Sequence, residues 1–237
     1  SPTGHLHLGH VVNAIYVWGL ARAAGGRVLL RMEDHDRVRC RPEFDSSILE
    51  DLDWLGFVPD DGLHPILRQS ERDDVYRSAL EQLRRTHHVY ACACSRKQIS
   101  GERYEGFCRE RGLAHQCGDL LLRDRDGNWT YQFAVTVDDM LQGITDIIRG
   151  EDLASSTGRQ LRLRQMLGGT GRPRFAHHRL ILKPGGAKLS KANRDTSLSE
   201  RRAAGEQAAS LLGEAAYLAG LSTSQRPLET QDIAGLF

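Results

Sequence analysis

Apolar residues recur along this chain with two periods, one typical of amphipathic helices and one typical of strands. Helices are expected over residues 9–24, from Pro42 to about Leu55, from about Arg72 to Arg85, and over 157–168. Strands are expected at 27–32, 90–94, 144–150 and 179–183, together with a hairpin over 119–137. Because the strands alternate with the helices, the pattern predicts an α/β fold with a Rossmann-like, doubly wound parallel sheet.

Two segments depart from this alternation. Residues 95–118 are rich in Gly, Cys and Arg without clear periodicity, so we expect an insertion that no hydrophobic core holds. The residues from Leu198 to Leu221 are rich in Ala, Leu and Glu, which favours a helical tail. The expected organisation is a first half of the Rossmann-like domain at 1–90, an insertion at 91–118, a second half at 119–198 and a tail at 199–237.

Composition narrows the class of protein. With 237 residues, of which 40% are hydrophobic, the chain can bury a sizeable core. It has no run of about 18 uncharged apolar residues, which argues against a transmembrane helix, and no signal-peptide pattern, which favours the cytoplasm. A net charge of +1 argues against charge-driven nucleic-acid binding as the main function but leaves room for a local basic face.

The first candidate site lies at the start of the chain, where a Pro/Gly turn leads into the first expected helix. His7 and His10 stand three residues apart at that helix start, with Gly9 between them. Free N–H groups and a positive dipole end favour phosphate there, and two imidazoles can donate to phosphate oxygens. A turn with two surface histidines is the alternative, but Gly9 favours a phosphate site because it lets a nucleotide approach the backbone.

A second candidate site follows the Pro184-Gly185-Gly186 turn, at Lys188, Ser190 and Lys191. The chain has four lysines, and three of them lie between 183 and 191. An ammonium on a flexible stem suits a phosphate that changes shape during reaction, and a Gly-rich loop can close over a ligand. Taken alone, the cluster could equally be a solvated basic loop.

Together these segments resemble the paired signature sequences of class I aminoacyl-tRNA synthetases, His-x-Gly-His and Lys-x-Ser-Lys-x. Here they read His7-Leu8-Gly9-His10 and Lys188-Leu189-Ser190-Lys191-Ala192, with Ala192 in place of the family's last serine. The resemblance implies that His7, Gly9, His10, Lys188, Ser190 and Lys191 bind ATP, which is used with Mg²⁺. It also implies that His7, His10, Lys188 and Lys191 act in catalysis.

Three further segments resemble glutamyl-type synthetases, and the likeness covers about residues 1–198. They are Arg31 to Asp36, Tyr131 to Ala134 with Asp138-Asp139, and Ile148 to Asp152. The resemblance implies that Glu33 holds the substrate ammonium, Tyr131 lines the pocket and Arg149 binds the side-chain carboxylate, with Ser1 also in the glutamate site. A glutamate ligand does need a buried cation for its second carboxylate and an acid for its amine. An exposed acidic turn at Glu33 and a surface strand end at Arg149 are the alternatives.

The five cysteines favour metal ligation over disulfides, because their number is odd and the chain has no secretion signal. The spacing of Cys92, Cys94, Tyr104 and Cys108 resembles the zinc insert of glutamyl-Q tRNA(Asp) synthetases, which implies one structural, four-coordinate zinc ion. His115 or Cys117 is an alternative to Tyr104 as fourth ligand, and free core cysteines are the alternative to any metal. Cys40 is expected to be unpaired.

The resemblance to glutamyl-Q tRNA(Asp) synthetases also covers the length of the chain. The residues after Lys191 suffice for a short tail but not for the anticodon-binding domains of a complete glutamyl-tRNA synthetase. The family's Arg-x-Ala-Pro segment, with a substrate-binding Arg, would come before Ser1. The resemblance implies that ATP activates glutamate without tRNA, and that glutamate is then placed on the queuosine base at the wobble position of tRNA(Asp). It implies no stable protein partner. The Arg-rich stretches 103–125 and 159–174 are candidates for phosphate contacts with the anticodon stem-loop.

Three other functions stay open at this point. The chain could be the catalytic fragment of a glutamyl-tRNA synthetase that charges the tRNA 3′ end, or a nucleotidyltransferase with another acid substrate. It could also be an RNA-binding relic without catalysis, since a fold does not fix a function. The intact histidine and lysine motifs argue against the relic, because a binding module has no use for them.

Overall fold

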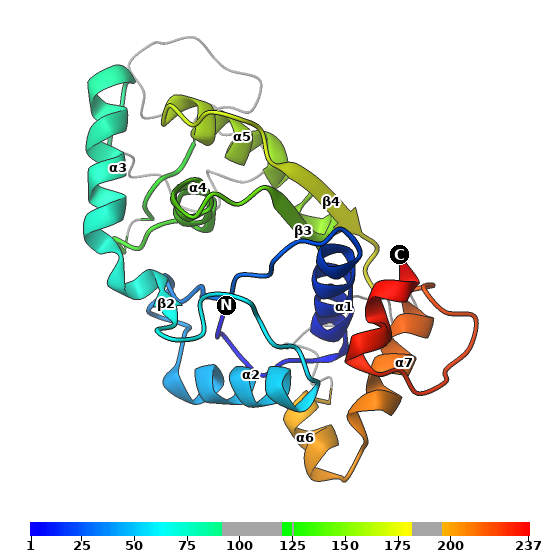
Figure 1. Ribbon diagram of the computed structural model, residues 1–237. Helices are drawn as coiled ribbons and strands as arrows, with labels where there is room; N and C mark the ends of the chain where they lie inside the picture. Colours follow the sequence, from blue (N-terminus) through cyan, green and yellow to red (C-terminus); the bar gives the residue numbers. More distant parts are fainter. Residues whose placement is uncertain (92–119, 125, 182–195) are drawn as a thin grey trace.

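The computed structural model of the chain describes residues 1–91, 120–124, 126–181 and 196–237. Its elements, in chain order, are α1 (Leu8–Ala23), β1 (Arg31–Met32), α2 (Pro42–Trp54), β2 (Leu67–Arg68), η1 (Gln69–Glu71), α3 (Asp73–Thr86), α4 (Tyr131–Leu141), β3 (Asp146–Gly150), η2 (Glu151–Leu153), α5 (Ser156–Met166), β4 (Arg174–His178), α6 (Leu198–Ala203), α7 (Ala208–Leu218) and η4 (Thr230–Leu236). Figure 1 shows α1 between the β3–β4 pair and the C-terminal helices. None of the helices in the described ranges is long and apolar enough to span a membrane.

The helices expected in the first third of the chain are confirmed. Pro42 occupies the first turn of α2, where its missing N–H costs no hydrogen bond, and acidic residues in the same turn complement the helix dipole. Helix α3 opens on two aspartates and closes on two arginines, which is the arrangement that the dipole favours. Local sequence signals therefore suffice to place α1, α2 and α3.

The strands are parallel, as expected, but they are short and form two separate pairs within the described residues. β1 pairs with β2, and an isolated bridge from Leu29 to Asp61 lies beside them, so the strand expected at 27–32 is reduced to Arg31–Met32. β3 pairs with β4 over five residues. Each pair is joined by a crossover that contains a helix, α2 in the first and α5 in the second, which is the β-α-β unit of a Rossmann-like fold.

The hairpin expected at 119–137 is wrong. It is limited to one bridge between Arg123 and Trp129, and the following residues form helix α4. Aromatic and β-branched residues favour a strand in isolation, but Phe133, Ala134 and Val137 lie at helical spacing and fill the core that α4 shares with α3 and α5. Tertiary packing therefore decides the structure of this segment.

The strand expected at 179–183 is also wrong, because the strand of this region is β4 and residues 179–181 follow it without strand structure. Pairing with β3 fixes the strand, since Asp146 lies opposite Arg174 and each later residue keeps this register. Ile181 packs instead against the cluster around α1. The strand expected at 90–94 is not formed at Tyr90 and Ala91, and its remaining residues lie outside the described ranges.

Two hydrophobic clusters hold these elements together. One joins α1 to α2, α6, α7 and η4, and the other joins α3, α4 and α5. The expected helical tail is interrupted at Gly205, whose φ of 83° separates α6 from α7. The end of the tail is part of the first cluster, because a Cβ built on Gly19 of α1 would lie 2.3 Å from the ring of Phe237. The tail therefore stabilises the helix that carries His10.

Candidate active site

His7 and His10 lie together at the N-terminus of α1, and their ring centroids are 3.9 Å apart. His7 is the N-cap, and its Nδ1 accepts a hydrogen bond from the backbone N–H of Gly9 at 3.2 Å. The backbone N–H of His7 donates to Nδ1 of His10 at 3.0 Å. Because both Nδ1 atoms accept hydrogen bonds, each neutral ring carries its proton on Nε2. Nε2 is therefore the donating nitrogen of both neutral rings.

Gly9 keeps this arrangement open. A Cβ at position 9 would lie 3.1 Å from Cε1 of His7, so a larger residue would push the ring aside. α1 has no acidic residue in its first turn, so no side chain there offsets the positive end of the helix dipole. This end of α1 is suited to bind phosphate.

Several predicted site residues lie outside the described ranges, and their roles stay predictions. They are Lys188, Ser190 and Lys191 of the second motif, and Cys92, Cys94, Tyr104 and Cys108 of the expected zinc site, with the alternatives His115 and Cys117.

Glu33 is held in place by Arg31, which lies two residues earlier. The Arg31 guanidinium donates to Oε1 of Glu33 at 3.0 Å and to Oδ1 of Asp139 at 2.9 Å. Burial alone would raise the pKa of Glu33, but Arg31 above all, and also His35, hold it below its ordinary value. Glu33 is therefore ionised at neutral pH and can accept hydrogen bonds from an ammonium ion.

A buried aspartate of α4, Asp138, lies close to Arg31 and helps to hold it in place. Asp138 is completely buried and accepts hydrogen bonds from Gln69 Nε2 at 2.8 Å, Arg72 Nε at 2.7 Å and the Tyr76 hydroxyl at 2.8 Å. Nε of Arg31 lies 3.8 Å from the same carboxylate. This network fixes α4 against α3 and against the strand that carries Arg31.

Tyr131, the first residue of α4, interacts with both Glu33 and Arg149. Burial raises the pKa of the phenol well above its usual range, and the carboxylate of Glu33 raises it further. The guanidinium of Arg149, which is hydrogen-bonded to the phenol, opposes this shift. The structure thus brings together Glu33, Tyr131 and Arg149, three of the four residues that the resemblance assigns to the glutamate site.

Arg149 is a buried cation whose hydrogen-bond partners are neutral. Its side chain comes from β3, and the residue is 6% exposed. Nη1 donates to Oε1 of Gln160 at 2.7 Å, Nη2 donates to Oγ1 of Thr157 at 2.8 Å, and Nε faces Nε2 of His177 at 3.3 Å. Among the described residues, no carboxylate lies within salt-bridge distance of this guanidinium. Burying a cation without a counterion is costly, so the site is suited to an anionic ligand.

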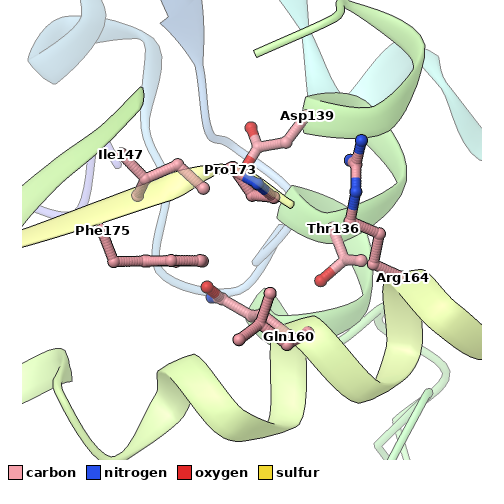
Figure 2. Close-up of a pocket in the computed structure, with 8 residues that line it drawn as sticks. Thr136, Asp139, Ile147, Gln160, Arg164, Pro173 and Phe175 are labelled. Carbon is pink, nitrogen blue, oxygen red and sulfur yellow. The ribbon is translucent and has the colours of Figure 1, made fainter. Parts of the chain in front are cut away.

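A small hollow adjoins these contacts between α4, α5 and the β3–β4 pair (Figure 2). Its walls are Thr136, Asp139, Ile147, Gln160, Leu161, Arg164, Pro173 and Phe175. Two of these residues also touch Arg149, since Gln160 accepts its hydrogen bond and Phe175 lies with its ring centroid 5.1 Å from the guanidinium carbon. The hollow is therefore lined in part by residues that contact Arg149.

Sequence reasoning missed the residues that hold Arg149 and Glu33. Thr157, Gln160 and His177 lie 8, 11 and 28 residues from Arg149, and no local periodicity connects them to it. His177 could be placed only with the correct strand, because it is the residue of β4 that pairs with Arg149. Arg31 stands in a segment that resembles glutamyl-type synthetases, but nothing in the sequence indicates that it would bind Glu33.

Comparison with known proteins places this site in a family. The family model of class I tRNA synthetases (E and Q), catalytic domain, matches residues 1–114 and 112–226. The glutamyl-Q tRNA(Asp) synthetase of Pseudomonas aeruginosa (strain LESB58) is 41% identical over 236 residues, covering 86% of this chain and 79% of the relative. That of Symbiobacterium thermophilum is 35% identical over 291 residues, covering 100% of this chain and 90% of the relative.

Solved structures agree with this result. The crystal structure of a glutamate tRNA ligase from Elizabethkingia meningosepticum in complex with its amino acid superimposes with a TM-score of 0.79 at 26% identity. The match covers 100% of this chain and 63% of that ligase, so the chain spans less than two thirds of its length. The expected Rossmann-like α/β fold is thereby confirmed at the level of the class I catalytic domain. The chain belongs to the class I tRNA synthetases (E and Q), a family of ligases, and within them to the glutamyl-Q tRNA(Asp) synthetases.

Proposed function

We propose that this protein joins glutamate to AMP with ATP and then transfers the glutamate to the queuosine base at the wobble position of tRNA(Asp). The relatives named glutamyl-Q tRNA(Asp) synthetase support this reading. The observation that carries the choice of amino acid is Arg149, a buried cation without a carboxylate partner among the described residues, beside Tyr131 and an ionised Glu33. A dicarboxylic amino acid supplies both the anion that Arg149 requires and the ammonium ion that Glu33 requires.

The first step needs no side-chain nucleophile. An α-carboxylate oxygen of glutamate attacks the α-phosphorus of ATP, the bond to the β-phosphate breaks, and pyrophosphate leaves. The Nε2–H groups of His7 and His10 are suited to donate to phosphate oxygens as charge develops on them, next to the positive end of α1. Lys188 and Lys191 are proposed to bind the same phosphates, and Mg²⁺, which accompanies ATP, would neutralise part of their charge.

In the second step a hydroxyl of the modified base attacks the carbonyl carbon of the adenylate, AMP leaves, and the hydroxyl proton is released. The RNA must then dock over the adenylate, and exposed arginines are suited to hold its phosphates. Not every arginine of 159–174 is available for this role. Arg174 pairs with Asp146 at 2.6 Å, and Arg164 donates to two loop carbonyls, whereas Arg172 is exposed. We propose Arg172 as a phosphate contact.

We further propose one structural zinc ion held by Cys92, Cys94, Cys108 and Tyr104, with His115 or Cys117 as alternatives to the tyrosine. The support is the spacing of these residues in the sequence. A closed, four-coordinate site would hold the insertion together and take no part in the chemistry.

A second candidate function is charging of the tRNA 3′ end, as in a glutamyl-tRNA synthetase. The likeness to a solved glutamate tRNA ligase favours it, although at lower identity than the glutamyl-Q relatives. Both functions share the first step and differ in the acceptor.

ATP–pyrophosphate exchange without tRNA, measured with each of the twenty amino acids, tests the first step. We expect exchange with glutamate alone, because Arg149 requires a second carboxylate on the ligand. Equal exchange with glutamine or aspartate would contradict the proposed pocket.

A further inference from the structure

The described hydrogen-bond partners of Arg149 hold it without neutralising its charge. An amide oxygen (Gln160), a hydroxyl (Thr157) and an imidazole nitrogen (His177) lie at 2.7, 2.8 and 3.3 Å from the guanidinium, and the phenol of Tyr131 is a further neutral partner. Each position could in principle carry an acidic residue of similar size, and buried arginines are usually paired with carboxylates. Here the described partners supply hydrogen bonds but no negative charge.

A chain of amide contacts fixes which end of Gln160 faces the arginine. Nε2 of Gln160 donates to Oε1 of Gln132 at 2.8 Å, and Nε2 of Gln132 donates to Oγ of Ser156 at 2.7 Å. With its N–H₂ group engaged on Gln132, Gln160 presents its oxygen to Arg149. Gln160 and Ser156 are both buried, so this orientation is protected from exchange with water. The chain therefore gives Arg149 a directed but uncharged acceptor.

Because the described partners of Arg149 carry no negative charge, binding at this site depends on the charge of the ligand. A carboxylate at position 160 or 157 would pair with Arg149 and remove most of the electrostatic difference between a γ-carboxylate and a γ-amide on the bound amino acid. With neutral partners, an amide ligand leaves the buried cation unpaired, and the carboxylate ligand alone relieves it. Discrimination between glutamate and glutamine thus depends on residues that do not themselves carry charge.

We propose that Gln160 and Thr157 are positioning residues that set the selectivity for glutamate over glutamine by holding Arg149 uncompensated. This inference rests on the proposed function, since it concerns the same amino-acid site. Arg149 alone is then not sufficient for selectivity, because the protein groups that contact Arg149 must also be neutral.

The test compares pairs of side chains of nearly equal size, of which one member carries a negative charge. Gln160→Glu is compared with the wild type, and Thr157→Asp is compared with Thr157→Asn. Thr157 lies in the first turn of α5, where an aspartate is favourable for the helix, so Thr157→Asp provides a variant that is expected to fold even if Gln160→Glu does not. The thermal melting of each purified full-length variant is recorded. The measured quantity is the ratio of kcat/KM for glutamate to kcat/KM for glutamine in ATP–pyrophosphate exchange without tRNA.

We expect each acidic variant to lower this ratio about 100-fold, which is the loss of one charge-assisted contact. Most of the change should be a higher KM for glutamate, because the contact is made in the ground state as well as in the transition state. Thr157→Asn should keep the ratio within about threefold of the wild type. If folded Thr157→Asp keeps the wild-type ratio, or if Thr157→Asn loses it equally, the inference is wrong. A wild-type protein with no glutamate-dependent exchange would instead refute the proposed function.

Discussion

Asp51 lies on α2 with its side chain completely buried, and neither carboxylate oxygen accepts a hydrogen bond from a described residue. Arg202 of α6 provides a cation at 3.5 Å from Oδ1, which is too far for a good hydrogen bond. Burial raises the pKa of Asp51 to about 6, although Arg202 and His5 oppose the shift. The ordinary value is 3.8, so the folded protein holds this proton more tightly than the unfolded chain does.

The sign of the effect follows from this difference. Below the unfolded pKa both states are protonated and the group costs nothing. As pH rises from there to about 6, the unfolded chain ionises first and the free energy of unfolding falls, and above that range the loss is constant. A difference of roughly two pH units corresponds to a loss of about 3 kcal/mol at pH 7.5.

Asp51→Asn removes the titration. Relative to the wild type, we expect the free energy of unfolding of the variant to rise by about 2 kcal/mol between pH 4.5 and pH 7.5, because only the wild type carries the Asp51 titration and about 1 kcal/mol of its loss has already occurred at pH 4.5. Urea unfolding of both proteins at pH 4.5 and pH 7.5 measures this difference in the free energy of unfolding. Glu50→Gln is the matched control, since Glu50 is solvent-exposed and also contacts Arg202, at 3.0 Å, so the variant removes a contact with Arg202 without changing the buried carboxylate. A difference between wild type and Asp51→Asn that is the same at both pH values would refute the reasoning.

Three further predictions concern the proposed activity. Arg149→Ala should lower kcat/KM for glutamate by the equivalent of about 2–3 kcal/mol of transition-state binding, because it leaves the ligand carboxylate in a buried site without its cation. Steady-state exchange kinetics measure kcat/KM, and a wild-type value in the variant would contradict the prediction. Lys188→Ala and Lys191→Ala should each slow adenylate formation in single-turnover assays while the Kd for glutamate stays nearly constant, since their contacts strengthen in the transition state; a large change in glutamate affinity would argue for a different role. Metal analysis should find one zinc per chain, lost in Cys92→Ser together with thermal stability, and zinc-free protein of normal stability would rule the site out.

The sequence determines the parts of this fold that depend on local signals. Pro42 at the start of α2 and the charges at the ends of α3 act within one or two turns, so their helices are predictable. Phe133 and its neighbours have strand propensity, but the core between α3 and α5 selects a helix, and nothing in the segment itself reveals that core. The strand β4 is fixed by pairing with β3, a contact between segments that α5 separates.

The residues of the candidate site also fall into those that local sequence predicts and those that depend on the fold. Its histidines could be predicted because both stand within one turn of a helix start, where spacing alone fixes their proximity. Glu33, Tyr131 and Arg149 could be named only by resemblance, because they come from three elements that the fold brings together. The neutrality of the partners of Arg149 could not be predicted, since it depends on which side chains of α5 and β4 face β3.

The identity of the acceptor tests the account most directly. Radiolabelled glutamate, ATP and the protein are incubated with an isolated anticodon stem-loop of tRNA(Asp) that carries queuosine, and with the same stem-loop carrying guanine. We predict that the queuosine stem-loop accepts glutamate without any acceptor stem and that the guanine stem-loop accepts none. Charging that requires full-length tRNA and is abolished by removal of the 3′-terminal adenosine would contradict it.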